Sequence, residues 1–146
     1  MKEPNTTVQP YLIMVEDNPR DIDLFRMALD RQGEPYQLAA LPDGQAALRF
    51  ILDRHVHPGE PLPCVLLLNV HLPKYDGIEV LEAIRREPAL SGVQVIMLSS
   101  GNVRPREEVA IQRWGALFRE KPREFSEVLQ LAADVLELCK QAMASA

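Results

Sequence analysis

The chain has 146 residues, with 16 Lys and Arg against 21 Asp and Glu, and a formal net charge of −5. This length predicts a single domain, and a composition of 47% hydrophobic and 25% charged residues is typical of a soluble globular protein. The acidic balance argues against non-specific binding to nucleic acid or to an anionic membrane surface, because both depend on Lys and Arg. The polar N-terminus and the absence of an apolar run of about 18–20 residues predict a cytoplasmic protein.

Short apolar runs alternate along the chain with segments of helical periodicity. We expect residues 1–10 to form a flexible leader, and residues 11–142 to form one domain with no effector domain. The predicted strands cover residues 11–15, 37–41, 64–68, 93–98 and 116–118. The helical patterns cover residues 18–33, 47–52, 77–84, 105–114 and 125–139.

This alternation predicts an α/β fold: a doubly wound, five-stranded parallel sheet of the flavodoxin-like kind, with helices on both faces. The stretch 53–63 contains three prolines and a glycine, so we expect a loop there, with His55 and His57 exposed to solvent. Cys64 and Cys139 are predicted to be separate, inert thiols in the core.

Polar residues follow four of the predicted strands, and the carboxyl ends of parallel strands meet at one edge of a sheet. Glu16 and Asp17 follow the first strand, Asn69 the third, Ser99 the fourth and Lys121 the fifth. Carboxylate oxygens suit Mg²⁺, while a hydroxyl and an ammonium suit phosphoryl oxygens. The pattern therefore predicts a site for Mg²⁺ and a phosphoryl group at this edge.

These motifs resemble the receiver domain of two-component response regulators over about residues 10–140. The segments that carry the resemblance are Val15-Glu16-Asp17-Asn18, Leu66 to Asn69 continuing to Gly77, Leu98-Ser99-Ser100 and Lys121-Pro122. The Pro-rich loop 53–63 is also similar to that of the stand-alone, phytochrome-associated response regulators.

The resemblance assigns a role to each of these positions. Glu16 and Asp17 correspond to the family's Mg²⁺-binding acids, and we expect a weak site that they form with Asn69 and the His71 backbone. Ser99 and Lys121 correspond to its phosphate contacts.

Two further positions follow from the same resemblance. Phe118 corresponds to the aromatic residue that changes rotamer on switching, and Pro122 matches the family's frequent cis-proline.

Asn69 departs from this pattern, because the family carries its phosphate-accepting aspartate there. A neutral amide oxygen is a far poorer nucleophile than a carboxylate, so we expect no phosphorylation at this position. Three explanations are open: a native pseudo-receiver, a deliberate block of the acceptor, or acceptance by Ser99 or Ser100 instead. Without that aspartate, a salt bridge from Lys121 to the Glu16-Asp17 pair is expected to replace the metal.

The expected function is signal transduction by protein docking, in the manner of bacterial two-component signalling and without enzymatic activity. The expected partner is a sensor histidine kinase or another phosphorelay protein. A homodimer through the segments 105–114, 116–118 and 125–139 is also consistent with the family. The alternative is a Mg²⁺-dependent phosphorelay receiver whose acceptor was mutated to Asn. A flavin-binding protein is disfavoured, because Glu16-Asp17 would repel a phosphate.

Overall fold

The computed structural model describes residues 9–144 as five strands, five α-helices and one short 3₁₀ helix. The strands are β1 (Tyr11–Val15), β2 (Gln37–Leu41), β3 (Val65–Asn69), β4 (Gln94–Ser99) and β5 (Leu117–Glu120). The α-helices are α1 (Pro19–Arg31), α2 (Gly44–Val56), α3 (Gly77–Arg86), α4 (Pro105–Arg113) and α5 (Phe125–Ala144), and the 3₁₀ helix is η1 (Pro88–Leu90). Residues 1–8 of the expected leader lie outside the described residues, and the Pro10 carbonyl already accepts a hydrogen bond from the Gln37 amide at 2.8 Å.

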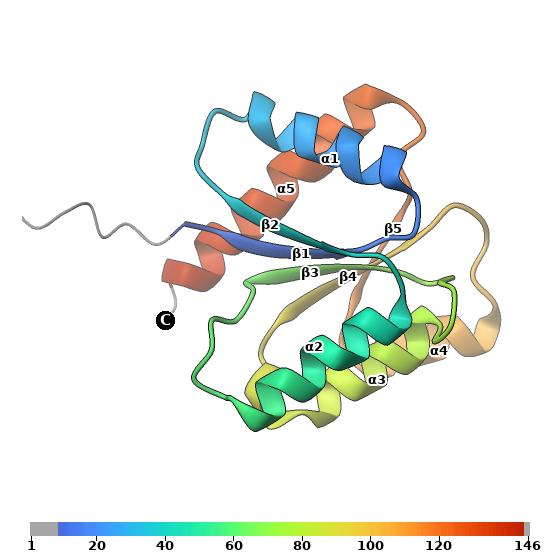
Figure 1. Cartoon of the computed structure of the whole chain (residues 1–146). Helices are drawn as coiled ribbons and strands as arrows, with labels where there is room; N and C mark the ends of the chain where they lie inside the picture. The colour runs from blue at the N-terminus through green and yellow to red at the C-terminus, as the bar shows by residue number, and fades with distance from the viewer. Residues whose placement is uncertain (1–8, 145–146) are drawn as a thin grey trace, which may run out of the picture.

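All strands are parallel, and their order in the sheet is β2-β1-β3-β4-β5. Helices α1 and α5 cover one face of this sheet, and α2, α3 and α4 cover the other (Figure 1). The predicted doubly wound α/β fold is confirmed. This topology brings the ends of β1, β3 and β4 together at one edge, where ligand sites of such sheets lie.

Each face of the sheet has its own apolar core, because side chains along a strand point alternately to the two sides. In β1, Leu12 and Met14 pack with residues of α1 and α5, whereas Ile13 and Val15 pack with residues of α2 and α3. Strand β3 is buried along its whole length. The central strands are therefore rigid supports for whatever follows them.

The prediction that residues 53–63 form a loop is wrong at its start, because α2 continues to Val56. The guanidinium of Arg54 stacks 4.2 Å from the Phe50 ring centroid and donates to the Pro61 carbonyl at 3.0 Å. His55 is on this helix, and its Nδ1 lies 2.7 Å from Glu87 Oε1. The contacts with Pro61 and Glu87, which lie outside the helix, stabilise the last turn of α2, and the helix ends just before Pro58, which cannot continue it. The local composition of residues 53–63 does not indicate such contacts.

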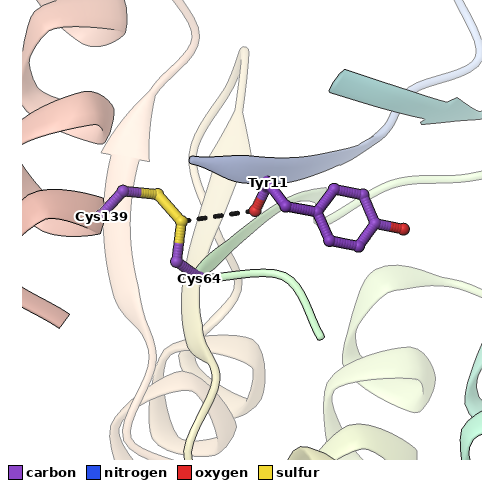
Figure 2. Close-up of a disulfide and its surroundings, with 3 residues drawn as sticks. All are labelled: Tyr11, Cys64 and Cys139. Carbon is purple, nitrogen blue, oxygen red and sulfur yellow. Dashed lines mark hydrogen bonds between the residues drawn. A yellow bond between two sulfur atoms is a disulfide. The ribbon is translucent and has the colours of Figure 1, made fainter. Parts of the chain in front are cut away.

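The prediction of two separate thiols is also wrong. Cys64 and Cys139 form a disulfide whose Cα atoms are 5.2 Å apart, next to the carbonyl of Tyr11 (Figure 2). The two cysteines are 75 residues apart in sequence, so their pairing depends on the packing of the start of β3 against α5, which local patterns do not indicate. This bond joins the sheet to α5 at the amino ends of the strands, opposite the edge formed by their carboxyl ends.

Between residues 9 and 144, none of the helices is long and apolar enough to cross a membrane.

Candidate functional site

The carboxyl edge of the sheet contains a cavity of about 250 Å³. Its lining includes most of the residues that the sequence singled out, the exceptions being Phe118 and Pro122: Glu16, Asp17, Asn69, His71, Ser99 and Lys121. Strand ends alone were enough to predict this convergence, because the order of a doubly wound sheet brings β1, β3 and β4 side by side.

Asn69 is the last residue of β3, and it lines the cavity. The residue is only 5% exposed, and its Oδ1 accepts no hydrogen bond from any described part of the chain. Gly77, at the start of α3, packs directly on the Asn69 carbonyl, where a Cβ would overlap that oxygen. Glycine is therefore required at position 77 for α3 to begin this close to the site.

Lys121 forms two ion pairs with acids that belong to other elements. Its Nζ lies 2.7 Å from Glu16 Oε1 and 2.9 Å from Asp21 Oδ2. The Glu16 side chain is completely buried, and its Oε2 accepts a hydrogen bond from the Asn18 amide at 3.0 Å. Both oxygens of Glu16 are therefore engaged within the chain.

The predicted salt bridge at Lys121 is thus present, but one of its partners was wrong. Asp21 takes the place expected of Asp17, which is exposed and has no ion-pair partner among residues 9–144. Asp21 lies in the first turn of α1, which faces the strand ends because Asn18 caps that helix and Pro19 begins it. An acid in the first turn after strand one was the signal that sequence reasoning missed.

The charge on Lys121 is stabilised by this arrangement. Partial burial would lower its pKa, but the contacts with Glu16 and Asp21 outweigh burial, so the pKa of Lys121 lies above its usual value. The lysine is therefore a permanent cation at neutral pH. It supplies positive charge where a bound metal ion would otherwise supply it.

Ser99 and Lys121 are joined through the backbone, since the Lys121 amide donates to the Ser99 carbonyl at 2.9 Å. The Ser99 hydroxyl is buried and donates to the Gly101 carbonyl at 2.9 Å. A phosphate contact would require this hydroxyl to turn away from Gly101.

Two predictions near Lys121 concern backbone and side-chain conformation. The expected cis-proline is wrong, because every peptide bond described, including the one before Pro122, is trans, which is the more stable isomer for most such bonds. Phe118 is 40% exposed and lies outside the cavity on β5, beside Met97 of β4. Its expected rotamer change stays a prediction.

The fold and this arrangement of side chains define the class of the protein. The chain belongs to the response regulator receiver domain family, whose model matches residues 12–133. Receivers are the signalling modules of two-component systems, so the family expected from the motifs is confirmed.

Individual members of the family can be compared with this chain. Response regulator Rcp1 of Synechocystis sp. is 33% identical over 91 residues, which cover 62% of this chain and 62% of Rcp1. The Mn²⁺-bound structure of Rcp1 matches with a TM-score of 0.73 and 26% identity, over 86% of this chain and 91% of that one. The probable methanogenesis regulatory protein FilR2 of Methanothrix harundinacea is 32% identical over 88% of this chain and 83% of its own length.

A phosphorylated relative matches the fold as well. The phosphorylated cyanobacterial phytochrome response regulator RcpA has a TM-score of 0.77 with 26% identity, over 89% of this chain and 93% of its own.

The residues around the cavity fit a divalent cation only in part. Asp17 and the Asn69 oxygen are available, and the expected weak site would add the His71 backbone. Glu16, however, is occupied by Lys121, so a metal ion would have to displace that ammonium. No group of three or more His, Cys, Asp and Glu side chains that could hold a metal is found within the described range.

Proposed function

We propose that this receiver signals by docking to a partner protein and is not phosphorylated at position 69. The observation that carries the proposal is Asn69, an amide at the strand end where the family accepts phosphate. A carboxylate attacks phosphorus through a charged oxygen, and the delocalised amide oxygen lacks that charge.

The ion pairs of Lys121 support the same proposal. A divalent cation, when bound in such a site, supplies positive charge against the phosphoryl oxygens. Here Lys121 lies 2.7 Å from Glu16 and supplies that charge from within the chain. In this proposal Mg²⁺ binds weakly, through Asp17 together with the oxygens of Asn69 and His71, and the resting site needs no metal.

The proposed partner is a sensor histidine kinase or another phosphorelay protein, and a phytochrome-type sensor is the first to test. RcpA, compared above, supports this choice, since it is a cyanobacterial phytochrome response regulator. The proposed docking face comprises α1 and the loops at the strand ends. Beside the site, a cavity of about 330 Å³ is lined by Leu24 and Phe25 of α1 and by Pro122. That recess could receive an apolar side chain of the partner.

The proposal also covers the cellular location of the chain, the activities that it lacks and its assembly. The chain is proposed to be cytoplasmic, to have no enzymatic activity and to bind neither nucleic acid nor membrane. A homodimer through α4, β5 and α5 is proposed as well. It is supported by the exposed apolar side chains of Val109, Leu117 and Phe118.

The second candidate is a phosphorelay receiver in which Asn69 alone blocks the acceptor. It is favoured by the retention of Asp17, Ser99 and Lys121 around one cavity of about 250 Å³. Restoring the carboxylate with Asn69→Asp would then restore the chemistry.

The test compares the original chain with Asn69→Asp, each incubated with a small-molecule phosphodonor and Mg²⁺. Asn102→Asp, the same change at an exposed position between β4 and α4, is the matched control. We expect no labelling of the original chain or of the control. Labelling of the original chain that is lost in Ser99→Ala or Ser100→Ala would identify a serine acceptor and contradict signalling by docking alone.

Labelling of Asn69→Asp alone would favour the blocked phosphorelay receiver, because its pocket would then be intact. A Mg²⁺ titration that is monitored by Trp114 fluorescence, with and without beryllofluoride, further distinguishes the docking receiver from the blocked phosphorelay receiver. Trp114 lies outside the cavity, so Asn69→Asp must first show that the signal responds. Sub-millimolar Mg²⁺ binding to the original chain would refute the replacement of the metal by Lys121.

A further inference from the structure

The two cysteines of the Cys64–Cys139 disulfide differ in their surroundings. Cys139 is completely buried on α5, within the core formed with α1 and the sheet. Cys64 is only partly buried, and it lines a cavity of about 420 Å³ at the amino edge of the sheet. Tyr11, Gln37, Pro61 and Leu62 line the same cavity. Of the two cysteines, Cys64 is therefore the one that borders a cavity, while Cys139 is enclosed by the core.

We propose that Cys64 is a site of reversible thiol–disulfide exchange with small thiols of the glutathione class. The thiolate of a small thiol attacks Cys64 Sγ, the protein disulfide breaks, and Cys139 becomes a thiol by taking up the proton that the small thiol gave up. The product is a mixed disulfide on Cys64. A second small thiolate then attacks the outer sulfur of that mixed disulfide, which releases the Cys64 thiolate and a small-molecule disulfide. The protein gains two electrons and two protons.

The reduced state is accommodated by the surroundings of both cysteines. Cys64 Sγ lies 3.3 Å from the carbonyl oxygen of Tyr11 (Figure 2), to which a thiol could donate. That oxygen already accepts from the Cys64 amide at 2.9 Å, and a carbonyl has two lone pairs. A reduced Cys139 would pack in the core as a small hydrophobic residue. Both redox forms therefore have partners in the same fold, so the exchange can run in both directions.

The exchange site is separate from the site of the proposed function. Cys64 immediately precedes β3, whereas Asn69 ends it, so the two positions lie at opposite edges of the sheet. In the proposed cytoplasmic location disulfides are mostly transient, which agrees with a bond that small thiols can open.

The first experiment treats the native chain with reduced glutathione, quenches the reaction with acid and maps the adduct by mass spectrometry. We expect a mixed disulfide on Cys64. Leu62→Trp places a larger side chain in the cavity and should slow the reaction severalfold, whereas Leu52→Trp, at an exposed leucine of α2, should leave the rate unchanged. An adduct on Cys139, reduction only after denaturation, or an unchanged rate in Leu62→Trp would each overturn the proposal.

The second experiment tests each sulfur alone with oxidised glutathione. Cys139→Ala leaves Cys64 as the single thiol, and Cys64→Ala leaves Cys139; both variants lack the disulfide, so they are matched. Far-UV circular dichroism first establishes that both are folded. We expect the Cys64 thiol to react at least about tenfold faster, because a thiol buried in apolar surroundings is inert. Equal rates in the two folded variants would contradict the inference.

Discussion

The two ends of β3 are built in opposite ways. At its carboxyl end, Asn69 has a buried oxygen without a hydrogen-bond partner within the described chain, beside two carboxylates, Glu16 and Asp21, that share one lysine. At its amino end, Cys64 is joined covalently to α5. The carboxyl end leaves polar groups imperfectly satisfied, as functional sites commonly do, whereas the amino end stabilises the fold. The two edges of one sheet thus differ in how they are held: a covalent bond at the amino edge, and ion pairs around a partly unsatisfied site at the carboxyl edge.

Removing the disulfide should have the largest effect on stability. The bond closes a loop with a sequence separation of 75, for which the chain-entropy model gives a contribution of about 4 kcal/mol to the free energy of unfolding. We expect the double variant Cys64→Ala/Cys139→Ala to lose about 2–5 kcal/mol in urea unfolding. Dithiothreitol should destabilise the original chain and leave the double variant unchanged. Equal free energies of unfolding for the original chain and the double variant would show that the disulfide does not stabilise the fold.

Removing the cation at the other end should have the next largest effect. Lys121→Met leaves the completely buried carboxylate of Glu16 without its ion-pair partner. Breaking a buried pair costs about 3–5 kcal/mol, and because the lysine is 20% exposed we expect about 2–4 kcal/mol. The control is Lys140→Met, which removes an exposed pair with Glu34 and should change the unfolding free energy little. Similar losses in both variants would mean that burial at the site does not matter.

Replacing the amide should cost much less. In Asn69→Leu, a buried oxygen that accepts no hydrogen bond from the described chain is exchanged for an apolar group. We expect the free energy of unfolding to stay within about 1 kcal/mol of the original or to rise, because no hydrogen bond to that oxygen is lost. A loss of several kcal/mol in urea unfolding would show that the Asn69 oxygen has a partner in solution, such as a cation.

The pH dependence of stability should reveal a smaller effect. Because the pKa of Lys121 is raised on folding, its contribution is fully present below the unfolded-state pKa of about 10.4 and is lost as pH rises through the folded-state value. The stability difference between the original chain and Lys121→Met should therefore be constant from about pH 7 to 9 and shrink above about pH 10.4. A difference that already shrinks near pH 8 would contradict the raised pKa.

Sequence patterns predicted the five strands, the five helices and the convergence of Glu16, Asn69, Ser99 and Lys121, because these follow from local periodicity and from the rules of parallel sheets. What they missed depends on contacts distant in sequence. Nothing near Cys64 indicates that α5 packs against it, and nothing near Lys121 indicates that Asp21 turns toward it. The last turn of α2 was missed for the same reason, since Arg54 and His55 are held by Pro61 and Glu87.

The disulfide also gives the molecule a covalent topology. Residues 64–139 form a closed ring that contains Asn69, Ser99 and Lys121, whereas Glu16 and Asp21 belong to an open segment that precedes it. Apart from the peptide bond before Cys64, only non-covalent contacts hold that segment to the ring, and the ion pairs of Lys121 are among them. If β1 and α1 detach in a partial unfolding event, the ring stays closed while the site loses both acids that neutralise its lysine. The state of the site therefore reports whether the open segment is docked on the ring.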